Sequence, residues 1–393
     1  VSARQASYDL VKKIDAPDPL TVVFQLRHLS ASFLANLASP WNFIYKASIL
    51  EKDPRWYEKN IMGTGPFTFV EYVAGSHWVG KKNPNYYIKG RPYLDGYKAV
   101  IIRDTAPRVA AVRSGQALIE FRGFNPAARD DVVKSLGKQV VVQESPWACN
   151  LTVTLNNEKK PFDDVRVRRA LTLAIDRWAG SQALSKISLM KPVGGLLRPG
   201  YEFATPEAEL TKLAGFGKNI EAARKEARKL LKEAGVPKVS FTLMTPTASD
   251  AQRLALVVQA MTREAGFDVK IQATEFATSL NLADKGDFDA YVLAWSGRAD
   301  PDGNAFSFHG CKQPLNYSGY CTPETDALLN QSRTLRSTDE RKKVYEQIAA
   351  KVLKERPIVY LYHRNWLWAY NTKLAGVRSV PDGLLRVQGL KMQ

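Results

Sequence analysis

The stretch Asn156–Arg177 reads NNEKKPFDDVRVRRALTLAIDR, and it is the part of the chain that decides the fold. Directly before it, the alternating β-branched and apolar residues of Leu151–Leu155 predict a strand. Pro161 predicts a turn, and Asp163 or Asp164 is suited to cap the first free N–H groups of a helix. Five residues at helical spacing then share one apolar face: Val167, Ala170, Leu171, Ala174 and Trp178. The stretch therefore predicts a strand, a turn and a helix that faces the core.

Strands and helices alternate from about Cys149 onward, which predicts an α/β lobe with a partly parallel sheet. The predicted strands are 239–244, 269–273, 290–295 and 358–362. Residues 220–234 form an amphipathic pattern that stops at Gly235. Asp250 is expected to cap the next helix, and Ser337 with Glu340 forms a capping box for a helix that runs through Lys354.

The composition is that of a folded, water-exposed protein. The 393 residues are 45% hydrophobic and 24% charged, and this length allows two or three domains. No apolar run approaches the roughly 18 residues that a membrane helix needs. The net charge of +17 raises the alternative of a nucleic-acid or anionic-surface binder. The charges are spread along the chain without a nucleic-acid-binding motif, so a solvated basic surface is the preferred interpretation.

The sequence offers little for catalysis or metal binding. It contains no Gly-x-Ser-x-Gly, His-Glu-x-x-His or Cys-x-x-Cys pattern. The histidines, which are His28, His77, His309 and His363, lack the spacing of a metal site. We therefore expect no catalytic residue, no metal ligand and no cofactor.

The cysteines favour an oxidising compartment. Cys311 and Cys321 flank a short segment rich in turn-forming residues, which predicts a local disulfide; two free thiols are the alternative. Cys149 stands in an apolar run and is interpreted as a small buried residue.

The segment Trp295–Asn304, WSGRADPDGN, follows an apolar strand and so occupies a strand's carboxyl end, where ligands bind in open α/β sheets. An aromatic ring, a guanidinium and two carboxylates can stack on a ligand and pair with its charged ends. The candidate ligand-binding residues here are Trp295, Arg298, Asp300, Asp302 and Asn304. The alternative is a structural Asp/Pro/Gly loop, in which Arg298 neutralises the two aspartates.

As a string, Asn156–Arg177 closely resembles the "N…PF-D-D-x-R-V-R-x-A-L-x-x-A-I-D-R" signature of family 5 extracellular solute-binding proteins, the peptide, nickel and oligosaccharide receptors of ABC importers. Three further segments of this chain resemble short sequence motifs of the family. They are GTGPF at 63–67, the helix pattern of Asp104, Arg108, Ala111, Ser114 and Gly115, and RKKVYEQI at 341–348. Gln116–Ile119 departs from the short acidic word that usually follows that helix.

The resemblance implies a two-lobe α/β fold of the periplasmic-binding-protein type (type II, cluster C), with mixed sheets flanked by helices and a hinge between the lobes. Residues 61–148 with 366–393 would form an incomplete large lobe, 149–365 the second lobe, and 1–60 a remnant of a small extra lobe. The family's opening quarter would be absent, which would leave sheet edges exposed.

The implied function is capture of a solute, above all a peptide, between the lobes and delivery to a membrane permease by a monomeric, periplasmic or membrane-associated receptor. In peptide-binding members, an aspartate of the loop after 290–295 holds the ligand's amino terminus. Trp147 and Asn150 are expected to line the cleft between the lobes. Dipeptide-binding members often carry an arginine where this chain has Thr245–Ala248, which argues against dipeptide selectivity.

Several alternatives remain open from the sequence. A receptor of the same fold could take an oligosaccharide, an opine or a metal complex. A protein of another class could be a periplasmic enzyme, a chaperone-like protein, or a basic binder of surfaces or nucleic acid.

Overall fold

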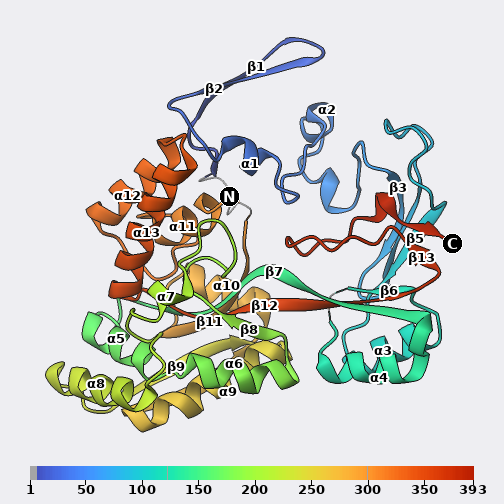
Figure 1. Ribbon diagram of the computed structural model, residues 1–393. Coiled ribbons are helices and arrows are strands. Elements are labelled where there is room, and N and C mark those ends of the chain that lie inside the picture. The colour runs from blue at the N-terminus through green and yellow to red at the C-terminus, as the bar shows by residue number, and fades with distance from the viewer. Residues whose placement is uncertain (1–6, 122, 299) are drawn as a thin grey trace. The chain divides into compact units, whose positions relative to one another are not determined.

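The computed structural model describes residues 7–121, 123–298 and 300–393 (Figure 1). Contacts divide the chain into two compact units, which we describe one at a time. The first contains the residues up to Ser39, Ala148–Lys186 and Met190–Arg364. The second contains Pro40–Trp147, Ile187–Leu189 and Asn365–Gln393. The division into lobes drawn from the sequence, with 1–60 as a separate remnant, stays a prediction.

A mixed sheet lies at the centre of the first unit. Its strands are β7 (Val140–Leu155), β8 (Met190–Val193), β9 (Val239–Pro246), β10 (Phe267–Thr274), β11 (Ala290–Ser296) and β12 (Ile358–Asn371). The order is β10-β9-β11-β7-β12, with β8 also paired to β12. β9 runs parallel to β10 and β11, whereas β11 and β7 are antiparallel. The expected partly parallel sheet is confirmed.

Helices flank this sheet. They are α5 (Val165–Leu173), α6 (Arg177–Ile187), α7 (Glu207–Leu210), α8 (Ile220–Glu233), α9 (Ser249–Thr262), α10 (Phe276–Asp284), α11 (Asp302–His309), α12 (Pro323–Thr334) and α13 (Thr338–Glu355). α9 packs along β9 and β10, and α5 packs against α8 and α13 (Figure 1). The apolar faces meet in one core that includes Val167, Ala170 and Leu171 of α5.

Several of the predicted local signals are confirmed. Asp164 caps α5, since its carboxylate accepts from the backbone N–H of Arg166. α8 ends just before Gly235, whose φ of 76° suits glycine. Ser337 accepts from the backbone N–H of Glu340 at the start of α13. The prediction that Asp250 caps its helix was wrong, because α9 begins after Ala248 and has no side-chain cap.

Asp250 instead forms ion pairs with Arg253 at 3.1 Å and with Arg364 of β12 at 2.6 Å. The carboxylate of Asp250, which the local sequence pattern predicted to be a helix cap, is therefore held by Arg364, a residue that only the tertiary structure brings close.

The two longest strands extend well beyond the predicted segments. Leu151–Leu155 is only the end of β7, which begins at Val140, and 358–362 is only the start of β12. Most of the added residues, 140–147 of β7 and 365–371 of β12, lie in the second unit, so both strands run from one unit into the other. A partner strand supplies the hydrogen bonds there, which a local residue pattern does not reveal.

The second unit contains smaller elements. An antiparallel sheet joins β3 (Phe67–Val73), β4 (His77–Lys82) and β5 (Gly96–Val100). The other strands are β6 (Ile119–Glu120), β13 (Leu374–Ala375) and β14 (Lys391–Met392), and the helices are α2 (Ala47–Leu50), α3 (Thr105–Arg113), α4 (Pro126–Leu136) and the 3₁₀ turns Trp56–Glu58, Gly137–Gln139 and Val387–Gly389. α3 packs on α4, and β6 pairs with the far end of β12.

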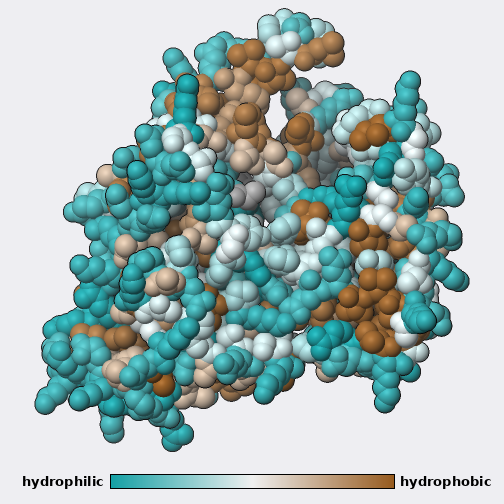
Figure 2. Space-filling model, in the orientation of Figure 1, coloured by the Kyte–Doolittle hydropathy of each residue, from teal (hydrophilic) through white to brown (hydrophobic). Residues whose placement is uncertain are grey.

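The first described elements belong to the first unit. β1 (Val11–Asp18) and β2 (Thr21–Leu26) form a hairpin, and α1 (Phe33–Leu37) follows. Apolar side chains are exposed on the hairpin, including Leu20 at 97% exposure, and appear brown at the top of Figure 2. The helix α8 presents a largely hydrophilic, teal surface in the same view, in keeping with its amphipathic sequence. Among the helices that the structure describes, we find none with the length and apolar character needed to span a bilayer.

The signature stretch does not form one helix. α5 ends at Leu173 and α6 begins at Arg177, where the Asp176 carboxylate accepts from the N–H of Ala179 at 2.9 Å. Arg177 explains the break because its Nη1 donates to the carbonyl of Thr172 at 3.0 Å. The guanidinium satisfies this carbonyl, which in a continuing helix would accept a hydrogen bond from the backbone N–H four residues later. The expectation of a single helix through Trp178 was therefore wrong.

Arg177 also ties three separate segments together. Its side chain is buried, and it donates to Tyr360 O at 2.8 Å and to Gly215 O at 2.5 Å. Gly215 has a φ of 79°, and a Cβ there would lie 2.8 Å from Thr172 O, so glycine is required. Burial lowers the pKa of Arg177 to about 10, which leaves the guanidinium charged at neutral pH.

We expect Arg177→Gln to lower the free energy of unfolding by roughly 3 kcal/mol or more. The substitution leaves buried carbonyls of Thr172, Gly215 and Tyr360 without their donor, and each such loss costs about 1–3 kcal/mol. Urea unfolding followed by tryptophan fluorescence measures the change. The matched control is Arg166→Gln, an exposed arginine of α5, which should cost less than about 1 kcal/mol. Equal losses in both variants would contradict the role given to Arg177.

Candidate ligand-binding site

Asn304 organises the segment between β11 and α11. Its Oδ1 accepts from the backbone N–H of Arg298 at 2.8 Å and from Trp295 Nε1 at 3.2 Å. Its Nδ2 donates to the carbonyl of Arg298 at 2.9 Å. Gly297 has no room for a side chain, since a Cβ would lie 2.7 Å from Ala148 O. The loop is thus fixed by one buried amide; its Ala299 lies outside the described residues.

Trp295 and Arg298 form a stacked pair in this loop. The Arg298 guanidinium carbon lies 4.4 Å from the centroid of the Trp295 ring, a cation–π distance. The ring of Phe308 in α11 packs edge to face against the same indole, with 4.8 Å between the ring centroids. Trp295 is partly buried, so an aromatic surface backed by α11 stands beside a positive charge.

Asp300 is held by Arg341 of α13. Its two carboxylate oxygens accept from Arg341 Nη2 at 2.9 Å and from Nη1 at 3.1 Å, which is a bidentate pair. The same carboxylate accepts from the backbone N–H of Asp302 at 2.9 Å. Both side chains are nearly buried, at 9% and 8% exposure. Arg341 belongs to the family word RKKVYEQI at 341–348, and no local signal points to its pairing with Asp300.

Asp302 lies deeper and is paired with Arg333 of α12. Its carboxylate is 3.2 Å from Arg333 Nε, and both side chains are buried. Burial raises the pKa of Asp302, while the charge of Arg333 and a hydrogen bond with Asn36 of α1 act in the opposite direction. The carbonyl of Arg333 also accepts from the N–H of Ala31 at 3.1 Å. Arg333 and Asn36 carry no local sequence signal that points to this site.

The remaining predicted residues belong to different units. Asn150, on β7 in the first unit, is buried and donates to Leu196 O at 3.0 Å. Trp147 belongs to the second unit, where its ring stacks on Trp366 at 4.9 Å and 11°. Their expected place along a cleft between lobes stays a prediction.

A disulfide joins Cys311 to Cys321, as predicted, just after α11. The loop that it closes is further held by Asn316, whose amide donates to the carbonyls of Gly310 at 2.9 Å and Tyr320 at 2.6 Å. Cys149 is buried and free, in agreement with its interpretation as a small core residue.

Two of the histidines are buried singly. His309 Nε2 lies 2.8 Å from Tyr360 Oη, and His363 Nε2 lies 3.2 Å from Gly195 O. Burial lowers the pKa of each to about 3. Over residues 7–121, 123–298 and 300–393, no group of three or more His, Cys, Asp or Glu side chains is placed to hold a metal ion.

The comparisons with known proteins decide the family. Residues 2–315 match the sequence model described as bacterial extracellular solute-binding proteins, family 5 Middle. The chain belongs to this family. It is 27% identical over 406 residues to the oligopeptide-binding protein AppA of Bacillus subtilis (strain 168), covering 96% of this chain and 72% of AppA. It is 26% identical to the periplasmic oligopeptide-binding protein OppA of Escherichia coli (strain K12), covering 84% of this chain and 61% of OppA.

Solved structures agree on the fold. The AppA complex with a nonapeptide is similar with a TM-score of 0.84 at 25% identity, covering 99% of this family 5 chain and 80% of AppA. AgaA of A. tumefaciens R10, in complex with agropinic acid, is similar with a TM-score of 0.86 at 25% identity, covering 100% of this chain and 79% of AgaA. The expected periplasmic-binding-protein fold is thereby confirmed.

We expect Asp302→Asn to lower the free energy of unfolding by roughly 3–5 kcal/mol. Removing one charge of a buried pair leaves Arg333 buried without its counter-ion. Urea denaturation measures the change. Asp339→Asn, at an exposed position in the first turn of α13, is the control and should change stability by less than about 1 kcal/mol. A stable Asp302→Asn protein would show that the pair does not hold the loop.

We also expect the two buried histidines to make the fold sensitive to acid. Their folded pKa of about 3 lies below the unfolded value of 6.5, so the unfolded chain binds more protons between these values. Their contribution is complete above pH 6.5 and is lost as the pH falls toward 3, by about 1.4 kcal/mol per pH unit for each histidine.

Comparing unfolding free energies at pH 7.5 and 4.5 tests this expectation. His309→Gln and His363→Gln should each show a smaller loss on acidification than the unmodified chain, whereas His28→Gln, at an exposed site, serves as the control. An unchanged loss in the double variant His309→Gln/His363→Gln would assign the acid sensitivity to carboxylates instead.

Proposed function

We propose that this protein is the substrate-binding component of an ABC importer and that it captures a peptide for delivery to a membrane permease. The observation that carries the proposal is the family 5 match over residues 2–315, together with the similarity to AppA in complex with a nonapeptide. The chain spans about six- to seven-tenths of the length of AppA and OppA, so the activity of an intact receptor is part of this proposal.

The proposal includes the setting in which the protein acts. OppA of Escherichia coli is named as periplasmic, which supports a periplasmic location, as does the disulfide. We propose a monomer that closes two lobes around its solute by a hinge motion, without catalysis. The strands β7 and β12, which both run from one unit into the other, support such a hinge.

A second candidate ligand is an opine. AgaA was solved with agropinic acid and has the same fold over the whole of this chain. Opines and peptides both carry charged and apolar parts, so one loop with an aromatic ring and ionic groups suits either class. The identity of the solute therefore needs a direct measurement.

Within the loop, we propose that Trp295 forms an apolar wall and that Arg298, stacked on it, contributes a positive charge toward the solute. The contacts of Asp300 with Arg341 and of Asp302 with Arg333 favour a structural role for both carboxylates. Arg333 lies at ion-pair distance from Asp302 and Arg341 from Asp300. Neutralisation of these carboxylates by Arg298 stays a prediction. Direct pairing of either aspartate with a peptide amino terminus stays a prediction.

Mass spectrometry of solutes that co-purify with the protein, followed by calorimetric titration, tests the function. We expect Trp295→Ala to weaken binding of the recovered solute by about tenfold, because burying an aromatic face is worth roughly 1.5–3 kcal/mol. The control is Phe276→Ala, an exposed aromatic of α10, which should leave the affinity unchanged. A recovered sugar or metal complex, or equal affinities in all variants, would contradict the proposal.

The same titration separates the two roles of the aspartates. If Asp300 or Asp302 pairs with a ligand cation, its Asn variant should bind about ten- to a hundredfold more weakly, since such a bond is worth about 1.5–3 kcal/mol. If both are structural, the folded variants keep their affinity and lose stability instead. A solute without a cationic group would also remove the reason for direct pairing.

A further inference from the structure

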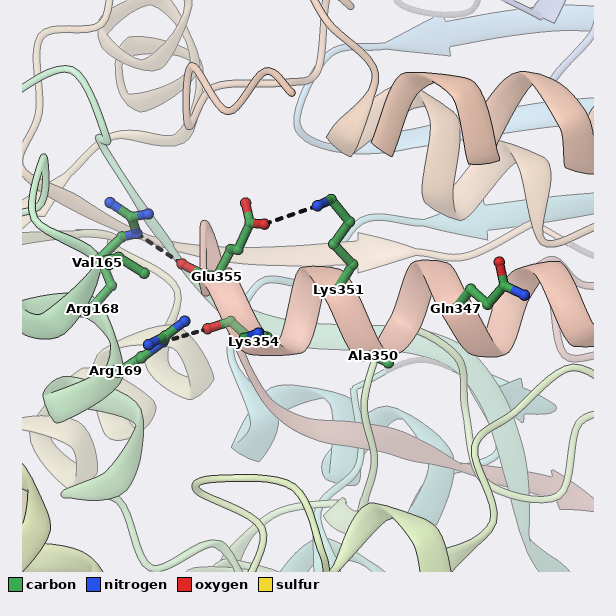
Figure 3. Close-up of a pocket in the computed structure, with 8 residues that line it drawn as sticks. All are labelled: Val165, Arg168, Arg169, Gln347, Ala350, Lys351, Lys354 and Glu355. Atoms are coloured by element: carbon green, nitrogen blue, oxygen red, sulfur yellow. Dashed lines mark hydrogen bonds and ion pairs between the residues drawn. The ribbon is translucent and has the colours of Figure 1, made fainter. Parts of the chain in front are cut away.

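A cavity lies between residues of α5 and α13, none of which belongs to the loop after β11. It has a volume of about 760 Å³ and opens between the start of α5 and the last turns of α13 (Figure 3). Its lining residues are Val165, Arg168, Arg169, Gln347, Ala350, Lys351, Lys354 and Glu355. All of them belong to the first unit, so the cleft does not depend on how the units are arranged. A volume of this size suits a small molecule.

Positive charge dominates this cleft. Four of its side chains are cationic and only Glu355 is acidic. Lys351 Nζ lies 3.3 Å from Glu355 Oε1, so the charge of this carboxylate is compensated by an ion pair with Lys351. Across the described part of the chain, no carboxylate lies within 4.0 Å of the cationic groups of Arg168, Arg169 or Lys354. The cleft therefore holds three cationic side chains without an ion-pair partner.

The two arginines are held in place by neutral groups. Arg168 Nε donates to the carbonyl of Glu355 at 3.0 Å, and Arg169 Nε donates to the carbonyl of Lys354 at 2.8 Å. Both bonds cross from α5 to the end of α13, as the dashed lines in Figure 3 show. The carbonyls orient the guanidinium groups without cancelling their charge. The arginines are thus positioned before any ligand arrives, which lowers the entropic cost of binding.

A further arginine follows the lining residue Glu355 directly in sequence. Arg356, which follows α13, is buried, and its pKa is lowered first by burial and then by the charges of Arg177 and Arg169. The charges of Arg177 and Arg169 thus act unfavourably on the charged form of Arg356. An anion in the cleft would reduce this repulsion.

We propose that the cleft between α5 and α13 binds a phosphate-bearing anion. Two guanidinium groups and a lysine around one space suit a multiply charged anion that accepts hydrogen bonds from several directions. A single carboxylate would compensate only one of the three cations. The phosphate can belong to a free anion or to the headgroup of an anionic lipid, and this inference does not rest on the solute-binding function.

Calorimetric titration with pyrophosphate at low ionic strength tests the site. We expect Lys354→Gln to weaken binding by about three- to tenfold, because it removes one charge at an exposed site. The matched control is Lys343→Gln, which removes the same charge from an exposed position of α13 outside the cleft. Arg169→Gln should weaken binding further, and its unfolding curve shows whether losing the bond to Lys354 O also alters the fold.

Co-sedimentation with vesicles distinguishes the two sources of phosphate. Binding to phosphatidylglycerol vesicles, but not to phosphatidylcholine vesicles, that is reduced in Lys354→Gln and not in Lys343→Gln identifies a lipid headgroup. Pyrophosphate binding with the same pattern and no vesicle binding identifies a free anion. Equal effects of the two lysine variants would mean attraction by the net charge of +17 alone, and that result, or no binding in either assay, overturns the proposal.

Discussion

Buried arginines that donate to backbone carbonyls are the constraint on which the first unit depends. Arg177 ends one helix of the signature stretch, starts the next and reaches the strand β12 through Tyr360 O. Arg168, one turn into α5, donates to Phe162 O at 2.7 Å and to the last carbonyl of α13. The partners are carbonyl groups, so the helices are joined where each of them has unsatisfied acceptors.

This choice of partner has an electrostatic consequence. A carbonyl satisfies the hydrogen bonds of a guanidinium but leaves its charge in place, so positive charge accumulates where α5 meets α13. The loop after β11 is built in the opposite way, with Arg341 on Asp300 and Arg333 on Asp302. One unit therefore contains a loop whose two aspartates are each paired with an arginine and a cleft with excess positive charge, and the two regions suit different ligands.

The loop after β11 also shows how a site can be positioned by groups far from it in sequence. Asn304 fixes its backbone, while helices α12 and α13 supply the arginines and α1 supplies Asn36. These contacts hold the loop rigid, and a rigid loop presents Trp295 and Arg298 at a lower entropic cost on binding. The disulfide from Cys311 to Cys321 restrains the segment that follows α11.

The sequence by itself determined the features that depend on near neighbours along the chain. The helical period and Gly235 define α8, and Ser337 with Glu340 starts α13. A short turn-rich segment brings together Cys311 and Cys321, which are ten positions apart. The signature words also identified the family and hence the fold. Only the tertiary structure decided the break between α5 and α6, the full length of β7 and β12, and the partners of Asp300 and Asp302. The strand lengths and the partners of the aspartates depend on groups tens to hundreds of residues away. At the helix break, the Arg177 side chain that occupies Thr172 O is itself held by the distant Tyr360 O, and a local pattern carries no information about such partners.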